Sequence, residues 1–218
     1  MVKRLPQNRN LHIQTEPTFR GLGHYPHGVP VHQYLHITHQ VMQDAIHEHP
    51  RTLAIRVDLR YPRYYQHEWN SAVMARFFDK FQYLLNNDYL ERLNRGVKAY
   101  STSLRYVWCR ETTEDSPCHY HVMLFLNRDA YYKLGDFNNL QQGLAGMIRL
   151  AWASALKVDV TEPLGAVHFP ENPTYKLDAY SPSFQQDFQD VFYRASYFAK
   201  AETKQWGDRT RSFGSSRK

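Results

Sequence analysis

Two strand-like segments separated by a short turn constrain the fold of this chain more than any other feature. Residues 118–127, CHYHVMLFLN, are mostly apolar, and residues 97–111 also have the composition of a strand. Between them, residues 112–117, TTEDSP, are of types that favour turns. The pattern predicts an antiparallel hairpin, so the fold must contain a β-sheet.

The other periodic segments predict helices and one more long strand. Residues 53–60 alternate in polarity, which predicts a strand with one buried face. Apolar periodicity predicts four helices, over residues 31–48, 69–93, 140–156 and 183–203. Ser183 would cap the last helix, and a short strand is expected at 166–169. This order favours an α+β fold in which helices cover an antiparallel sheet.

Neither end of the chain shows a clear period. Residues 1–30 are rich in Pro, Gly, His and Arg and predict an extended N-terminal arm. Residues 205–218 are basic and rich in small side chains, which predicts a flexible tail. We therefore expect one folded domain over residues 31–204.

Charge, aromatic content and cysteine content indicate a partner and a compartment. A formal net charge of +6 and an aromatic share of 15% over 218 residues favour a polyanionic partner with bases to stack on. Two cysteines are too few for a disulfide framework and fit a reducing cytosol. No apolar run approaches the length of a membrane span. The sequence predicts a cytoplasmic protein without a membrane partner.

A histidine pair at the start of the second hairpin strand predicts a metal site. His119 and His121 are two residues apart, so both imidazoles lie on one face of the strand. Neutral imidazoles bind divalent metals, and a harder third ligand would complete the site. Glu111, near the end of the partner strand, is the first candidate for that ligand. Asp115 in the turn and Asp58 on the polar side of the first strand are the others.

The last predicted helix has a polar face made of phenols and ammonium groups. At about 100° per residue, Tyr193, Tyr197, Lys200 and Lys204 fall within about 60° of one another, opposite an apolar arc. A phenol can act as a nucleophile when a nearby lysine lowers its pKa or holds the target phosphate. If the apolar arc lies on the sheet, however, the tyrosines point away from the histidines.

The two constellations together resemble the HUH endonucleases, which start rolling-circle replication of phages and plasmids. The motifs are CHYHVMLF at residues 118–125 and YFAK at 197–200, which has the Y-x-x-K spacing. More closely, CHYHVMLFLN and YFAKAETK look like the YagK/YfjJ family of prophage proteins, also described as inovirus replication proteins. The resemblance covers roughly residues 52–204.

The resemblance implies an antiparallel sheet of about five strands, of HUH or RRM-like type, with the histidines on a central strand. It also implies Mg²⁺ or Mn²⁺ as the cofactor. The substrate would be single-stranded or hairpin DNA at the replication origin of a phage, prophage or plasmid in a bacterial host. Cleavage would leave a 5′-phosphotyrosyl link. The chain has no helicase motif, so a host helicase would have to unwind the DNA.

The same resemblance implies roles for single residues. Glu111 corresponds to the Glu that often precedes the histidine pair on the neighbouring strand of such initiators. Tyr193 adds the Y-x-x-x-Y spacing of initiators with two tyrosines. Those initiators commonly carry Lys just before the second tyrosine, where this chain has Ser196. Tyr197 is therefore the preferred nucleophile, with Tyr193 second and Lys200 as the assisting cation.

Two alternatives remain open from the sequence. One is a non-catalytic nucleic-acid-binding protein or regulator, in which Tyr100, Tyr106 and Phe125 on an RRM-like sheet stack on bases. The other is a zinc protein whose ligands are Cys109, Cys118, His119 and His121.

Overall fold

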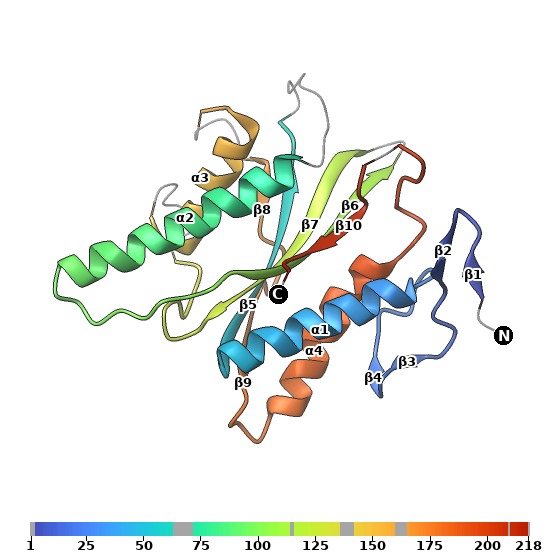
Figure 1. The fold of residues 1–218 in the computed structure, drawn as a ribbon, viewed down its shortest axis with the longest axis horizontal. Helices are drawn as coiled ribbons and strands as arrows, with labels where there is room; N and C mark the ends of the chain where they lie inside the picture. The colour runs from blue at the N-terminus through green and yellow to red at the C-terminus, as the bar shows by residue number, and fades with distance from the viewer. Residues whose placement is uncertain are drawn as a thin grey trace.

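A six-stranded antiparallel sheet forms the centre of the fold in the computed structural model (Figure 1). The structure describes residues 3–62, 72–113, 116–135, 142–159, 165–208 and 210–217. The strands of this sheet are β5 (Arg51–Arg60), β6 (Arg105–Thr113), β7 (Ser116–Asn127), β8 (Val167–His168), β9 (Thr174–Asp178) and β10 (Phe213–Ser215). Their order is β10-β6-β7-β5-β8, and β9 also pairs with β5. The α+β class expected from the sequence is confirmed.

The predicted hairpin is β6 and β7, which pair from Arg105 opposite Phe125 to Glu111 opposite His119. The strand prediction was too long at its start, because residues 97–104 form no strand. The partner strand explains the difference. Since β7 ends at Asn127, residues that precede Ser103 have no strand to pair with in this register.

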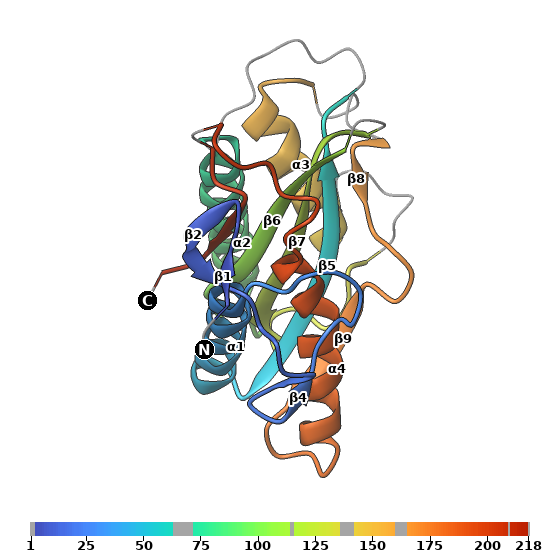
Figure 2. The same ribbon diagram turned by 90° about the vertical axis from the view of Figure 1, so that its right-hand side faces the viewer.

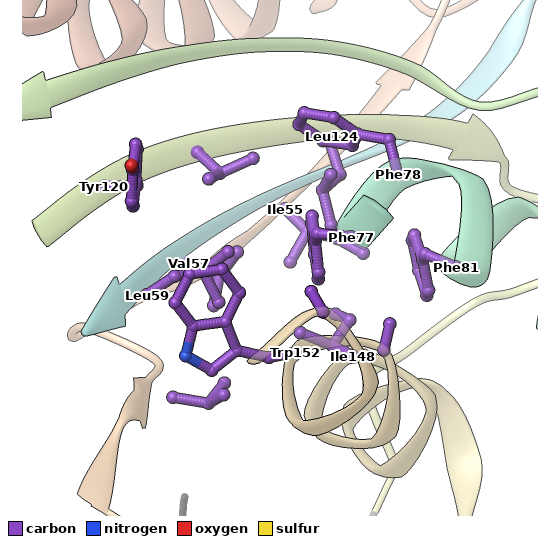
Figure 3. Close-up of a cluster of buried hydrophobic side chains, with 14 of the residues drawn as sticks. Ile55, Val57, Leu59, Phe77, Phe78, Phe81, Tyr120, Leu124, Ile148 and Trp152 are labelled. Atoms are coloured by element: carbon purple, nitrogen blue, oxygen red, sulfur yellow. The ribbon is translucent and has the colours of Figure 1, made fainter. Parts of the chain in front are cut away.

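Helices cover both faces of the sheet (Figures 1 and 2). Helices α2 (Ala72–Asn94) and α3 (Gly143–Leu156) lie on one face, and α1 (His32–Glu48) and α4 (Phe184–Ser196) lie on the other. The first face packs Ile55 and Val57 of β5 against Phe77 of α2 and Trp152 of α3 (Figure 3). Four helices were expected, and the predicted starts of α2 and α3 lie outside the described residues.

Strand β5 is buried on both faces, which corrects the prediction of a single buried face. Its odd-numbered residues pack under α2 and α3. Its even-numbered residues include Ala54, Arg56 and Asp58, and these are buried as well. The alternation of Arg56 and Asp58 with apolar residues indicated a face exposed to solvent, but α1 and α4 cover that face of the sheet. A buried Arg and Asp two residues apart therefore mark the site described below.

Helix α4 ends earlier than predicted. It stops at Ser196, a 3₁₀ turn follows at Tyr197–Ala199, and Lys200 has extended backbone. In a helix that continued to residue 203, the Ala199 carbonyl would accept a hydrogen bond from Thr203. It accepts one from the Val31 N–H instead, at 2.8 Å. The N-terminal segment thus replaces the next helical turn. Ser183 occupies the N-cap position, but its side chain makes no capping hydrogen bond.

Both chain ends are more ordered than the sequence suggested. The predicted arm contains two short hairpins, built from β1 (Arg4–Leu5), β2 (Asn8–His12), β3 (Thr18–Phe19) and β4 (Leu22–Gly23). The predicted flexible tail contributes β10, which pairs with β6 along Val107–Cys109. Phe213 enters the core beneath α1, stacked on Tyr34 at 4.2 Å between ring centroids. Among the described residues, no helix has the length and hydropathy needed to cross a membrane.

Candidate metal centre and tyrosine

Three side chains predicted as metal ligands converge at the end of the β6–β7 hairpin. Glu111 lies directly opposite His119 in the ladder, and His121 is two residues further along β7 on the same face. His121 Nε2 lies 3.2 Å from His119 Nε2 and 3.2 Å from Glu111 Oε2. One ligand atom from each of the three residues lies within 4.8 Å of the others. The hairpin register alone brings them together.

The second nitrogen of His121 is held by the buried pair of β5. His121 Nδ1 lies 2.7 Å from Asp58 Oδ1 and 2.6 Å from Arg56 Nη2, and Arg56 also pairs with Asp58 at 2.8 Å. Burial acts to raise the pKa of Asp58, but His121 and Arg56 outweigh it and hold that pKa at about 2. The contacts with Asp58 and Arg56 fix the orientation of the His121 ring and leave Nε2 directed at Glu111 and His119.

Asp58 was one of three alternatives for the third ligand. It contacts Nδ1 of His121, whereas Glu111 contacts Nε2 on the other side of the ring. Asp115, another alternative, lies outside the described residues. Glu111 is the acid that the structure brings to the histidine pair.

The Glu111 carboxylate is held by side chains on both of its oxygens. Tyr197 and His121 contact Oε2, while the Thr203 hydroxyl donates to Oε1 at 2.6 Å and Lys204 Nζ donates to Oε1 at 3.2 Å. Burial acts to raise the pKa of Glu111, but the contacts with His121, Lys204 and Thr203 lower it far below its usual range. The acid is therefore a carboxylate at neutral pH.

Tyr197 reaches the centre from the end of α4. It is the first residue of the 3₁₀ turn that follows Ser196. The apolar side of α4 packs on the sheet, yet the Tyr197 hydroxyl donates to Glu111 Oε2 at 3.0 Å. Its ring meets His121 edge-on with centroids 5.4 Å apart. The conflict between an apolar contact and a site-facing tyrosine is thus resolved for Tyr197.

The residues matched in known proteins include all of these groups. Residues 16–216 match the model of the YagK/YfjJ C-terminal domain. The chain belongs to the YagK/YfjJ family. It is 35% identical to YagK of Escherichia coli (strain K12) over 198 residues, which cover 87% of this chain and 95% of YagK. It is 34% identical to YfjJ of the same organism over 188 residues, which cover 82% and 90%. No solved structure matches the chain.

In this YagK/YfjJ family member, the polar face predicted for the last helix does not form. Tyr193 lies on α4 with 44% of its surface exposed and makes no described contact with the three convergent residues. Lys200 lies beyond the 3₁₀ turn, with Nζ 5.9 Å from the centre of the Tyr197 ring. Lys204 is the buried lysine that pairs with Glu111. A projection at 100° per residue fails because the helix ends before either lysine.

Arg56 and Thr203 are contributors that the sequence reasoning did not select. Arg56 also lies over the ring of Phe198, 4.5 Å from its centre. A charged residue between apolar neighbours in a strand was the available signal for Arg56. No local pattern marks Thr203, which reaches Glu111 only because the chain turns back along β6.

Two sets of residues from the alternative interpretations do not assemble as required. The stacking residues of an open sheet are covered, since Phe125 is buried and Tyr106 stacks on Phe78 at 3.4 Å. Tyr100 lies outside the sheet. The two cysteines lie in different cores on opposite faces of the sheet, so they cannot both join the histidines at a zinc ion.

The donor atoms fit a divalent cation. Neighbouring ligands at about 2.1 Å from an octahedral ion lie about 3 Å from one another. The two 3.2 Å separations around His121 Nε2 match that spacing. Two imidazoles and one carboxylate are also a donor set that suits Mn²⁺ and accommodates Mg²⁺ better than a thiolate set would.

Proposed function

We propose that this protein is a metal-dependent DNA endonuclease and strand transferase of the HUH type, with Tyr197 as its nucleophile. The hydrogen bond from the Tyr197 hydroxyl to Glu111 Oε2 carries the proposal, because the same oxygen lies against His121 Nε2. Glu111 Oε2 thus contacts both the phenol and one of the imidazoles that would bind the metal. Attack on a phosphate held by a metal requires such proximity.

The cleavage step joins the Tyr197 oxygen to the phosphorus and breaks the bond between phosphorus and the 3′-oxygen. One proton passes, in net terms, from the phenol through solvent to the leaving oxygen. The products are a 5′-phosphotyrosyl link and a 3′-hydroxyl, and the reverse step rejoins the strand. A divalent ion such as Mg²⁺ or Mn²⁺, when bound by Glu111, His119 and His121, would polarise the phosphate.

The surrounding side chains prepare the phenol and the ligands. Burial and the adjacent Glu111 raise the pKa of Tyr197, so the phenol keeps its proton until substrate arrives. Lys200 Nζ lies over the Tyr197 ring, 5.9 Å from its centre, and its charge suits a phosphate oxygen. Arg56 and Asp58 act through His121, whose orientation they fix.

The proposal extends to a biological role. The antiparallel sheet with the histidine pair on an inner strand is compatible with an HUH-type or RRM-like domain. The substrate would be single-stranded or hairpin DNA at an origin of rolling-circle replication in a phage, prophage or plasmid. The protein would act in the cytoplasm of a bacterial host, with a host helicase supplying the unwinding.

A non-catalytic DNA-binding regulator is the second candidate, and one observation favours it. Lys204 and Thr203 already occupy Glu111 Oε1, so the carboxylate is neutralised without a metal. In that case the cluster stabilises the fold and the protein binds DNA in the absence of divalent ions.

Covalent attachment to DNA separates the two. The purified protein is incubated with a labelled pool of random-sequence single-stranded oligonucleotides and Mn²⁺, then run on a denaturing gel. A shifted band that requires Mn²⁺ is expected for the wild type and for Tyr193→Phe, and its loss is expected for Tyr197→Phe. Attachment that persists when both Tyr193→Phe and Tyr197→Phe are present would disprove a tyrosine nucleophile at this site.

A further inference from the structure

The segment that crosses the end of α4 is fastened to it at several points. The Val31 N–H donates to the Ala199 carbonyl, and the Ala201 N–H donates to the Val29 carbonyl at 2.9 Å. The Val29 N–H also donates to Glu202 Oε1. Gly28 has φ of +97°, and a Cβ there would lie 2.7 Å from the Glu202 carboxylate, so this turn requires glycine. Residues 24–31 therefore have a defined place beside the tyrosine.

Ser196 makes the closest link between this segment and the helix. Its buried hydroxyl accepts a hydrogen bond from the Tyr25 N–H at 2.7 Å and donates one to the Tyr193 carbonyl at 2.7 Å. A lysine at this position, as in initiators with two tyrosines, could not make both bonds. Ser196 thus positions Tyr25 between the two tyrosines of α4 and its 3₁₀ turn.

Three rings gather around Tyr25. The Tyr25 ring centroid lies 5.1 Å from that of Tyr197, 6.4 Å from that of Tyr193 and 5.4 Å from that of His27. Tyr25 is half-buried, while Tyr193 and His27 are exposed. We call Tyr25, His27 and Tyr193 the aromatic platform. It continues directly from the ring that carries the nucleophilic oxygen.

An exposed group of rings beside a nucleophile suits a specific ligand. Every nucleobase has a flat face that can cover an aromatic side chain, and bases next to a cut phosphate in single-stranded DNA are available for such stacking. Lys200 lies at the same end of the helix, and its charge suits the backbone phosphates. The buried rings of the sheet, including Phe125, cannot serve this purpose.

We infer that the aromatic platform binds the unpaired bases that flank the scissile phosphate, and that Tyr193 is a base-stacking residue instead of a second nucleophile. The inference rests on the proposed function, whose substrate it places on the protein. Ser196 and Gly28 are positioning residues, since they set the place of Tyr25 without facing the DNA.

Binding without cleavage tests the inference. Affinity for a fluorescently labelled oligothymidylate is measured by anisotropy in EDTA, with Tyr197→Phe as the parent protein so that no covalent product forms. Tyr25→Ala and Tyr193→Ala should each weaken binding by about five-fold or more. Tyr193→Phe keeps a ring and should bind like the parent. Tyr83→Ala, which removes an exposed tyrosine of α2, is the matched control and should also bind like the parent.

The outcomes are distinct. If both alanine variants bind like the parent while the wild type still forms a covalent product with Mn²⁺, the platform is wrong and the proposed function stands. If the parent binds no single-stranded DNA, both are wrong. Thermal unfolding identifies a variant that has lost its structure. Since Tyr193 is exposed, Tyr193→Ala decides the question even if Tyr25→Ala fails to fold.

Discussion

Replacement of Asp58 by Asn should destabilise the metal-free protein by an amount that depends on pH. The fold holds the pKa of Asp58 at about 2, below its ordinary value of 3.8. At neutral pH that difference corresponds to about 2 kcal/mol in favour of the folded state. Asp58→Asn forfeits this term and also leaves Arg56 buried without its partner, which adds a further penalty.

The sign of the pH dependence follows from the lowered pKa. The stabilisation is complete above pH 3.8 and is lost as pH falls through 2, because protonated Asp58 no longer attracts Arg56. By pH 3, about half of the 2 kcal/mol should be lost. The difference in stability between the wild type and Asp58→Asn should therefore be about 1 kcal/mol smaller at pH 3 than at pH 7.

Urea unfolding in EDTA at pH 7, 4 and 3 measures this difference. Asp79→Asn, an exposed carboxylate of α2, serves as the control and should change stability little at any of the three. A difference between the wild type and Asp58→Asn that stays constant from pH 7 to pH 3 would refute the reasoning. The buried charge of Asp58 would then play no part in the stability of the site.

Four other predictions follow from the same structure. His121→Ala should weaken Mn²⁺ binding in isothermal calorimetry by at least about ten-fold. An unchanged Kd would show that Glu111, His119 and His121 do not form the metal site. Gly214→Ala should destabilise the protein by about 1–3 kcal/mol in chemical denaturation, because the new Cβ would lie 2.6 Å from the Trp108 indole. An unchanged stability would contradict the pairing of β10 with β6. Phe192→Ala, which empties a fully buried position under α4, should cost about 3–5 kcal/mol in the same assay, and a value below 1 kcal/mol would contradict the packing of α4 on the sheet. Burial raises the pKa of Cys109 to about 11, so its thiol should resist labelling at pH 8 until the protein unfolds, and rapid labelling of the native protein would contradict its burial.

The histidine site was predictable because it depends on local rules. Strand alternation puts His119 and His121 on one face whatever surrounds them. A short turn then brings Glu111 opposite His119, as the β6–β7 register has it. Helices α1 and α2 were predictable for a similar reason, since their apolar periodicity extends over several turns.

The sequence selected Tyr197 but left its direction open, and the helix projection applied to it was wrong. The 100° projection assumed a helix up to residue 203, and it grouped Tyr193 with Tyr197. Whether a helix continues depends on what else competes for its last carbonyls. Here the Val31 N–H takes the Ala199 carbonyl, a contact across 168 positions that no local pattern encodes.

The sequence by itself determined which elements form and which side chains share a face of the β6–β7 hairpin, because both depend on neighbours a few residues apart. Only the tertiary structure decided that Arg56 and Asp58 are buried, since that depends on α1 and α4 covering a second face of the sheet. Only the tertiary structure decided that the Tyr197 hydroxyl reaches Glu111, because the two residues are 86 positions apart and meet only where the end of α4 lies beside β6. Contacts between distant segments thus determined the direction in which the tyrosine points.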